Sequence, residues 1–145
     1  MPETISDVCT CLAIRRAARH ISSYYDRHLA PSGLLTSQFS ILGRLRQRGG
    51  CTIQDLAADL VMDRTTLGRN LGPLERDGLV AIAADPADRR RRLLHVTDAG
   101  LERLAVARPL WQAAQQGFAD AFGEAPARDL RDRLASLVAT ELPHP

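Results

Sequence analysis

The sequence predicts a mainly helical fold in which four helices precede a β-hairpin and two more helices follow it. Apolar residues recur at helical spacing before residue 80 and after residue 97, whereas two short runs between these positions alternate apolar and polar residues. Glycine or proline stands at most of the boundaries. With 145 residues, the chain is long enough for one domain, or for one compact domain with a dimerisation extension.

The first two expected helices are amphipathic. One continuous helix is expected from Ser6 to about Ala30, and the Pro-Ser-Gly sequence at 31–33 should end it. The second helix should begin near Thr36 and stop at Gly49. Both need another element against which to bury their apolar faces.

The next two expected helices are short, and each starts with a capping residue. Thr52 begins a capping box, in which its hydroxyl accepts the Asp55 N–H while the Asp55 carboxylate reaches back. Asp63 is the expected N-cap of the following helix, which should end at Gly78. Two short helices joined by a tight turn are typical of proteins that place the second helix in the major groove of DNA.

A β-hairpin should follow, with strands around residues 80–82 and 94–96 and a polar loop at 85–88. Thr97 should cap a long helix, and Gly123 should separate that helix from the last one. The first helix and these last two lie outside the helix-turn-helix unit. Their broad apolar faces need a partner.

The helix after the tight turn has a buried leucine side and an outer side rich in arginine, threonine and glycine. On the outer side, Arg69 is placed to bond in bidentate fashion to a guanine edge, while Thr65 and Thr66 can contact a phosphate or a thymine methyl. Gly68 and Gly72 let the backbone lie close to the groove floor. Each glycine costs a helix about 1 kcal/mol, and a solvated surface would gain nothing in return, so the pattern favours a DNA-facing surface.

Four consecutive arginines, Arg89 to Arg92, stand at the expected hairpin tip. Asp85 and Asp88 offset part of this charge and shape the turn. A solvated loop is the alternative interpretation. With the preceding helix in the major groove, however, the tip lies over a phosphate ridge and the adjacent minor groove, where one arginine inserts and the others neutralise phosphates. The sequence therefore predicts a protein that binds double-stranded DNA.

Composition agrees with selective rather than indiscriminate binding. The formal net charge of +2 is too small for a general polycation, and all 19 basic residues are arginine. Arginine suits guanine edges and narrow minor grooves, although a GC-rich genome also explains the bias. No apolar run of membrane-spanning length and no signal-type apolar core occurs, so we expect a cytoplasmic protein with no membrane contact.

Several stretches of this sequence resemble the MarR family of bacterial transcriptional regulators. The resemblance covers essentially the whole chain, and its most specific part is the Thr-Asp-Ala-Gly sequence at 97–100. The matching stretches are Leu35–Phe39, Asp63–Leu71, Leu74–Val80, Asp88–Arg90 and Leu94–Gly100.

The resemblance implies a winged helix-turn-helix homodimer built from a single domain over residues 1–145. Residues 35–97 would form the DNA-binding lobe, and residues 1–34 and 98–145 would supply interlocking dimerisation helices. A two-fold dimer should bind a pseudo-palindrome whose half-sites lie about one helical turn apart.

The resemblance also assigns roles to single residues. Arg89 would enter the minor groove, and Arg90 would pair with the carboxylate of Asp63. Gly68 departs from the threonine or serine often found at its position. The residues that we expect to contact DNA are Ser37, Arg64, Thr65, Thr66, Arg69, Asn70, Arg89, Arg90 and Arg91.

Members of this family usually repress, and they release DNA when a small phenolic or aromatic acid binds between the dimerisation helices and the DNA-binding lobe. Such a ligand needs only to prefer the spacing of recognition helices that does not fit DNA. The alternative is that Tyr24 and Trp111 are ordinary core or interface groups and that His20 is a surface group. The candidate ligand contacts are Arg15, Arg19, His20, Tyr24, Phe39 and Trp111.

Oxidation is the rival switch. Cys11, near the start of the first helix, resembles the sensor cysteine of the organic-peroxide-sensing branch of the same family, and Cys9 could act as its resolving partner. A helix N-terminus favours the reactive thiolate. Arg15 departs from a tyrosine of that branch, however, whereas Tyr25 matches another. On an intact helix the two thiols diverge, so a disulfide between them would require unwinding. The alternative is that both thiols are inert. Cys51 is expected to be a packing residue.

An enzyme is not expected. Asp55 and Asp59 share a helix face, but Asp55 is explained by capping, and the sequence has no nucleophile motif, phosphate-binding glycine loop or metal-ligand cluster beside them. We therefore expect no catalytic residue, metal or cofactor. A winged-helix adaptor or an RNA-binding module remains a further alternative, and it would bind without sequence preference for duplex DNA.

Overall fold

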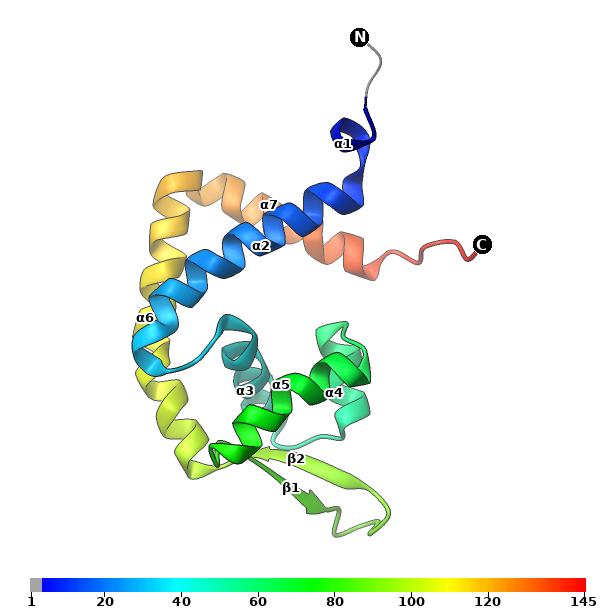
Figure 1. Cartoon of the computed structure of the whole chain (residues 1–145), viewed down its shortest axis with the longest axis vertical. Helices are drawn as coiled ribbons and strands as arrows, with labels where there is room; N and C mark the ends of the chain where they lie inside the picture. The colour runs from blue at the N-terminus through cyan, green and yellow to red at the C-terminus, as the bar shows by residue number, and fades with distance from the viewer. Residues whose placement is uncertain (1–3) are drawn as a thin grey trace. The chain divides into compact units, whose positions relative to one another are not determined.

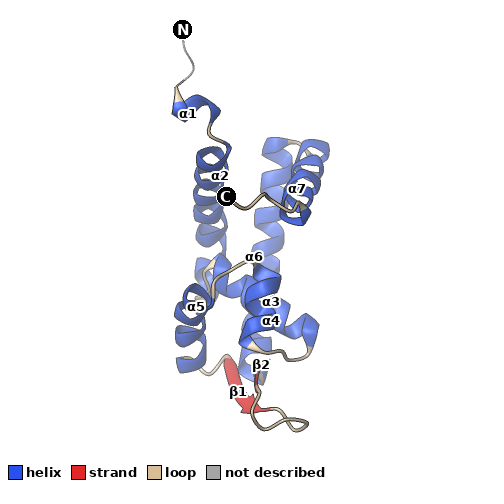
Figure 2. Ribbon diagram, turned by 90° about the vertical axis from the view of Figure 1, so that its right-hand side faces the viewer, coloured by secondary structure: helices blue, strands red, loops and turns tan. Residues whose placement is uncertain are grey.

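The computed structural model describes residues 4–145 and confirms the mainly helical fold with one hairpin (Figures 1 and 2). It divides into two compact units, residues up to Trp111 and residues Gln112–Pro145, which we describe separately. None of the described helices is both long and apolar enough to cross a bilayer. The elements are α1 (Ile5–Val8), α2 (Thr10–Leu29), the 3-10 turn η1 (Ala30–Ser32), α3 (Thr36–Arg48), α4 (Ile53–Leu60), α5 (Arg64–Arg76), β1 (Val80–Ala84), β2 (Arg92–Val96), α6 (Asp98–Phe122) and α7 (Glu124–Ala139).

The first helix is not continuous, so that prediction was wrong. Cys9 has extended backbone, with φ −77° and ψ 103°, and separates the four-residue α1 from α2. Its thiol sulfur accepts the Leu12 N–H at 3.4 Å and so caps α2. Ile5 and Val8 are exposed, at 83% and 56% of their surface. Because the apolar side chains of this first turn are exposed in the single chain, local capping at Cys9 decides where the long helix begins.

The helix-turn-helix follows the predicted capping residues. The Thr52 hydroxyl accepts the Asp55 N–H at 3.1 Å, and the Thr52 N–H donates to the Asp55 carboxylate at 3.4 Å. The turn after α4 contains Val61 in the left-handed region, with φ 53°. A β-branched residue rarely adopts this conformation, so the turn is locally strained. Gly78, with φ 72°, follows α5 as expected.

The core of the first unit lies among α3, α4, α5 and the hairpin. The two strands pair in antiparallel register, with Val80 opposite Val96 and Ile82 opposite Leu94. Cys51, in the connection before α4, forms a further bridge: its N–H and carbonyl bond the carbonyl and N–H of Leu94 at 3.2 and 2.7 Å. The largest of the fully buried side chains are Leu29, Ile41, Leu42, Leu45, Leu56, Leu67 and Leu74.

The second unit consists of the end of α6, Gly123 and α7. Phe118 and Phe122 stack one turn apart, with ring centroids 5.2 Å apart. Ala127 is buried, but the leucine and valine residues along α7 remain exposed in the single chain. These exposed apolar residues are Leu130, Leu134, Leu137 and Val138, with Leu142 beyond the helix end.

Candidate nucleic-acid interface

The N-terminus of α5 is fixed by Asp63, as predicted. One carboxylate oxygen accepts the Thr66 N–H at 2.8 Å, and the other accepts the Thr66 hydroxyl at 2.7 Å. These two hydrogen bonds, with a smaller contribution from the Thr65 N–H, hold the pKa of Asp63 below its ordinary value. The cap therefore stays ionised at neutral pH, where its charge also complements the positive end of the helix dipole.

α5 presents a polar outer face because its leucines turn inward. Leu67, Leu71 and Leu74 are at most 4% exposed. Arg64, Thr65 and Arg69 are exposed. Among the described residues, the two arginines form no ion pair. Both guanidinium groups are therefore available to an external anion or base edge.

Two further residues of the predicted interface bond within α5 itself. The Thr66 hydroxyl donates to Asp63, and the Asn70 side-chain amide donates to the Thr66 carbonyl at 2.9 Å. In this conformation one N–H of the Asn70 amide bonds its own helix backbone, while its second N–H and its carbonyl oxygen are not used in that bond. Their DNA contacts remain predictions.

Gly68 and Gly72 interrupt the outer face without any internal packing requirement. A Cβ atom added at either position meets no other atom within 4 Å. Neither glycine has a positive φ. Alanine would therefore fit both positions in the isolated chain, and the glycines leave open space against the helix backbone.

The hairpin tip is shaped by its two aspartates. Asp85 accepts the Ala87 N–H at 2.9 Å, and the Asp88 carboxylate accepts the Arg90 N–H at 3.0 Å. These turns place the four arginines at 89–92 in exposed positions. Figures 1 and 2 both show the hairpin extending beyond α3, α4 and α5, so that its tip stands clear of the helices.

The ion pair expected between Arg90 and Asp63 is absent among the residues that the structure describes. The Asp63 carboxylate is instead satisfied by Thr66 within its own helix turn. Local capping needs no ordering of a long side chain, whereas a surface ion pair contributes only about 0–1 kcal/mol. Arg90 is consequently left exposed beside the other wing arginines.

Sequence reasoning missed a second group of charges beside the wing. Asp55 has its pKa lowered mainly by hydrogen bonds with Thr52 and, to a lesser degree, by the charges of Arg48 and Arg91. Arg48 at the end of α3 and Arg91 of the wing therefore lie near the same carboxylate. Residues more than 40 positions apart come together here because Cys51 pairs with β2, a contact that no local pattern reveals.

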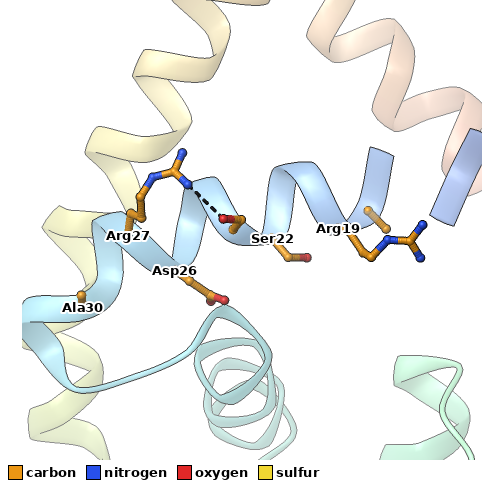
Figure 3. Close-up of a pocket in the computed structure, with 7 residues that line it drawn as sticks. Arg19, Ser22, Asp26, Arg27 and Ala30 are labelled. Atoms are coloured by element: carbon orange, nitrogen blue, oxygen red, sulfur yellow. Dashed lines mark hydrogen bonds between the residues drawn. The ribbon is translucent and has the colours of Figure 1, made fainter. Parts of the chain in front are cut away.

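The predicted ligand contacts do not gather in one cavity. Phe39 and Trp111 stack, with ring centroids 5.9 Å apart. Tyr24 packs against the ring of His28, which lies one turn further along α2. Only Arg19 of the predicted group lines the open pocket of about 610 Å³ beside α2 (Figure 3). The other lining residues are Ala18, Ser22, Ser23, Asp26, Arg27 and Ala30. Arg15 and His20 are exposed on α2.

The three cysteines occupy different environments. Cys11 is exposed, Cys9 is partly exposed, and Cys51 is 5% exposed. Burial raises the pKa of the Cys51 thiol, which keeps it protonated and unreactive. Cys51 is therefore a packing residue, as predicted. Within the described part of the chain, no group of three or more His, Cys, Asp or Glu side chains is arranged to hold a metal ion.

A helix-turn-helix followed by a basic hairpin defines the class of winged-helix DNA-binding proteins. The model of the MarR family matches residues 32–91. The MosR transcriptional regulator of M. tuberculosis, solved in complex with DNA, is 38% identical to this chain over 92% of it and 99% of MosR, with a TM-score of 0.77. The chain belongs to the MarR family of DNA-binding transcriptional regulators.

Other similar proteins agree with this assignment. BadR, a transcriptional activatory protein of Rhodopseudomonas palustris, is 36% identical over 93 residues, which are 62% of this chain and 49% of BadR. The chain thus matches about half of that relative's length. BpsR of Bordetella bronchiseptica, whose DNA binding is regulated by 6-hydroxynicotinic acid, has the same fold, with 24% identity over 97% of this chain and all of BpsR and a TM-score of 0.84. These relatives are transcriptional regulators rather than enzymes.

Proposed function

We propose that this protein is a homodimeric, sequence-specific repressor that binds a pseudo-palindromic operator and releases it when a small ligand binds. The observation that best supports DNA recognition is the outer face of α5, where Arg64 and Arg69 are exposed and unpaired among the described residues beside two open glycine positions. Arg69 bonds a guanine edge, and Arg89 to Arg91 contact phosphates and the minor groove. Ser37, Thr65, Thr66 and Asn70 add contacts around them.

The homodimer is supported by the apolar surface of α7. Four large apolar residues, between 37% and 66% exposed, follow the helix at positions 130, 134, 137 and 138. Exposed leucines at this spacing are costly in water unless another apolar surface covers them. We assign dimerisation to residues 1–34 and 98–145, and DNA binding to residues 35–97.

Footprinting on the DNA upstream of the protein's own gene tests the proposal. We expect protection of two half-sites about one helical turn apart. The protein that binds them should sediment as a dimer. A monomer, or binding that ignores base order at physiological salt, would overturn it. The relative BadR is named as an activatory protein, so transcription measured with and without the protein decides whether the effect is repression.

The proposed release of the operator by a small ligand is supported by the pocket along α2. Five polar residues are among those that line it: Arg19, Ser22, Ser23, Asp26 and Arg27. Such a lining suits a small acid with an apolar body. Elsewhere in the first unit, aromatic surface is supplied by Tyr24, Phe39 and Trp111. Arg15 and His20 supply polar groups on α2. Titration of the protein–operator complex with aromatic acids should release DNA.

A redox switch through Cys9 and Cys11 is the second candidate, and the break at Cys9 favours it. A continuous helix would hold these two thiols apart, but Cys9 lies outside α2 in extended conformation, so no helical turn must unwind before they approach. Cumene hydroperoxide or diamide should then weaken operator binding, and Cys11→Ser should remove the response. Unchanged affinity after oxidation would exclude this switch.

A further inference from the structure

The corner between α2 and α3 is fixed by hydrogen bonds from separate elements. The buried Ser32 hydroxyl donates to the Leu29 carbonyl at 2.6 Å and accepts the Leu34 N–H at 3.3 Å. From α6, the Arg103 guanidinium donates to the Ser32 carbonyl at 3.2 Å. The end of the long helix and the start of the DNA-binding lobe are thus joined at a defined angle.

α3 begins with a residue that cannot cap it. Leu35 occupies the N-cap position with extended backbone, but its side chain has no hydrogen-bond acceptor. Gln38 supplies half of a capping box by accepting the Leu35 N–H at 2.9 Å. The first helical N–H, that of Thr36, donates instead to Asp26 of α2 at 2.7 Å. The carboxylate that caps α3 therefore belongs to a different helix.

The close-up of the pocket shows how Asp26 connects two parts of the first unit. Its side chain leaves α2 toward the start of α3, while the neighbouring Arg27 points the other way and bonds Ser23 (Figure 3). Asp26 also lines the pocket. One side chain thus belongs both to the pocket wall and to the N-terminus of the helix that carries Ser37.

We propose that Asp26 is a positioning residue that holds the DNA-binding lobe in the orientation required by the operator. This inference rests on the proposed function. A dimer binds two half-sites at once, so each lobe must be held at a fixed angle to its long helix, and a lobe that swivels loses affinity in proportion to the orientations it samples. The Asp26–Thr36 bond is a charge-assisted link across that joint.

A local cap separates this role from simple stabilisation of α3. Asp26→Ala removes both the cap and the link. Adding Leu35→Asp to Asp26→Ala gives α3 a cap of its own without restoring the link, and Leu35 is 53% exposed, so the new carboxylate stays in water. Asp26→Asn keeps an acceptor oxygen. Gln38→Ala is the matched control, because it removes the local bond to Leu35 and leaves α2 untouched.

We expect Asp26→Ala to lower the melting temperature, to accelerate hydrogen exchange of the Thr36 amide and to weaken operator binding about fivefold or more. The double variant should regain melting temperature, because an N-cap aspartate accepts the Ser37 or Gln38 N–H, but it should keep the rapid exchange of the Thr36 amide and the weakened operator binding. Asp26→Asn should bind within about twofold of wild type, since the link persists. Gln38→Ala should lose stability without losing operator affinity.

Full recovery of operator binding in the double variant would overturn the inference and leave Asp26 as a cap only. Wild-type affinity in Asp26→Ala would do the same. If the wild-type protein itself binds no operator, the proposed function fails, and this result appears before any variant is compared.

Discussion

α3 and α5 are two helices of equal length within one lobe, but they meet their surroundings differently. Each has 13 residues and buries three apolar side chains. α5 is capped by its own Asp63, whereas α3 is capped from α2. On α3, Arg44 and Arg48 both lie within 4.0 Å of Asp59 of α4. α3 is therefore tied to its neighbours on several sides, while Arg64 and Arg69 on the outer face of α5 form no ion pair with a described residue.

The glycines of these two helices sharpen the contrast. Gly43 of α3 and Gly68 and Gly72 of α5 all have open space where a Cβ atom would lie. In α5, both glycines share a face with the exposed Arg69. We predict that glycine is a neutral residue in α3 and part of a DNA-facing surface in α5, a difference that substitution can measure.

The largest expected effect is on Arg69. Arg69→Ala should weaken specific operator binding by about 1–3 kcal/mol, because a bidentate contact to a guanine edge is lost. The matched variant on α3, Arg46→Ala, should change operator affinity by less than about 0.5 kcal/mol, since Arg46 is exposed and is not among the residues that we expect to contact DNA. Gel-shift titrations on matched and mutated operators measure both. Equal losses in the two variants would remove the distinction between α3 and α5.

The capping residues and leucine faces behind this comparison were predictable from sequence because they act within one or two helical turns. Thr52 with Asp55, and Asp63 with Thr66, sit at the spacings that local hydrogen bonding requires. The two strands of the hairpin followed from alternation around Val80 and Leu94, whereas their register is known only from the structure. The outer face of α5 was predictable for the same reason, since helical periodicity alone separates it from the leucines.

The features that the sequence could not reveal arise from competing local preferences or from contacts between residues in different elements. The break at Cys9 arises because a thiol caps α2 while the apolar side chains of α1 are exposed in the single chain. The Asp26–Thr36 bond joins residues ten positions apart across a corner. Val61 adopts a left-handed turn that its residue type disfavours. In each case tertiary structure or a weak local preference decided the outcome, and no periodic pattern recorded it.

The second prediction uses the three glycines. Alanine at position 43, 68 or 72 should raise the free energy of unfolding by roughly 0.5–1 kcal/mol, because alanine is the better helix former. Only Gly68→Ala and Gly72→Ala should also weaken operator binding, by about 1 kcal/mol or roughly fivefold, since a methyl group would fill the space between the helix backbone and the base edges. Stability and affinity would then change in opposite directions.

Denaturant unfolding and gel-shift titration on the same preparations measure the two quantities. Gly43→Ala is the internal control, expected to gain stability and keep operator affinity. If all three variants bind operator as the wild type does, the glycines of α5 do not face a groove.

The smallest expected effect concerns acid stability and tests the Asp63 cap of α5. Hydrogen bonds from Thr66 lower the pKa of Asp63 in the folded state, so the unfolded chain takes up a proton first as the pH falls. The stability that this group contributes is fully present above its unfolded pKa of about 3.9 and is lost as the pH falls through the lower folded value. Asp63→Asn keeps a capping oxygen that does not titrate. Its melting temperature should therefore fall less steeply below pH 4 than that of the wild type, with little change at pH 7.

Asp132→Asn is the control, because Asp132 is an exposed residue of α7 with no ion pair to a described residue. Its melting temperature should follow the wild-type curve. If the melting temperatures of Asp63→Asn and Asp132→Asn fall equally below pH 4, the Asp63 cap adds no pH-dependent stability to α5.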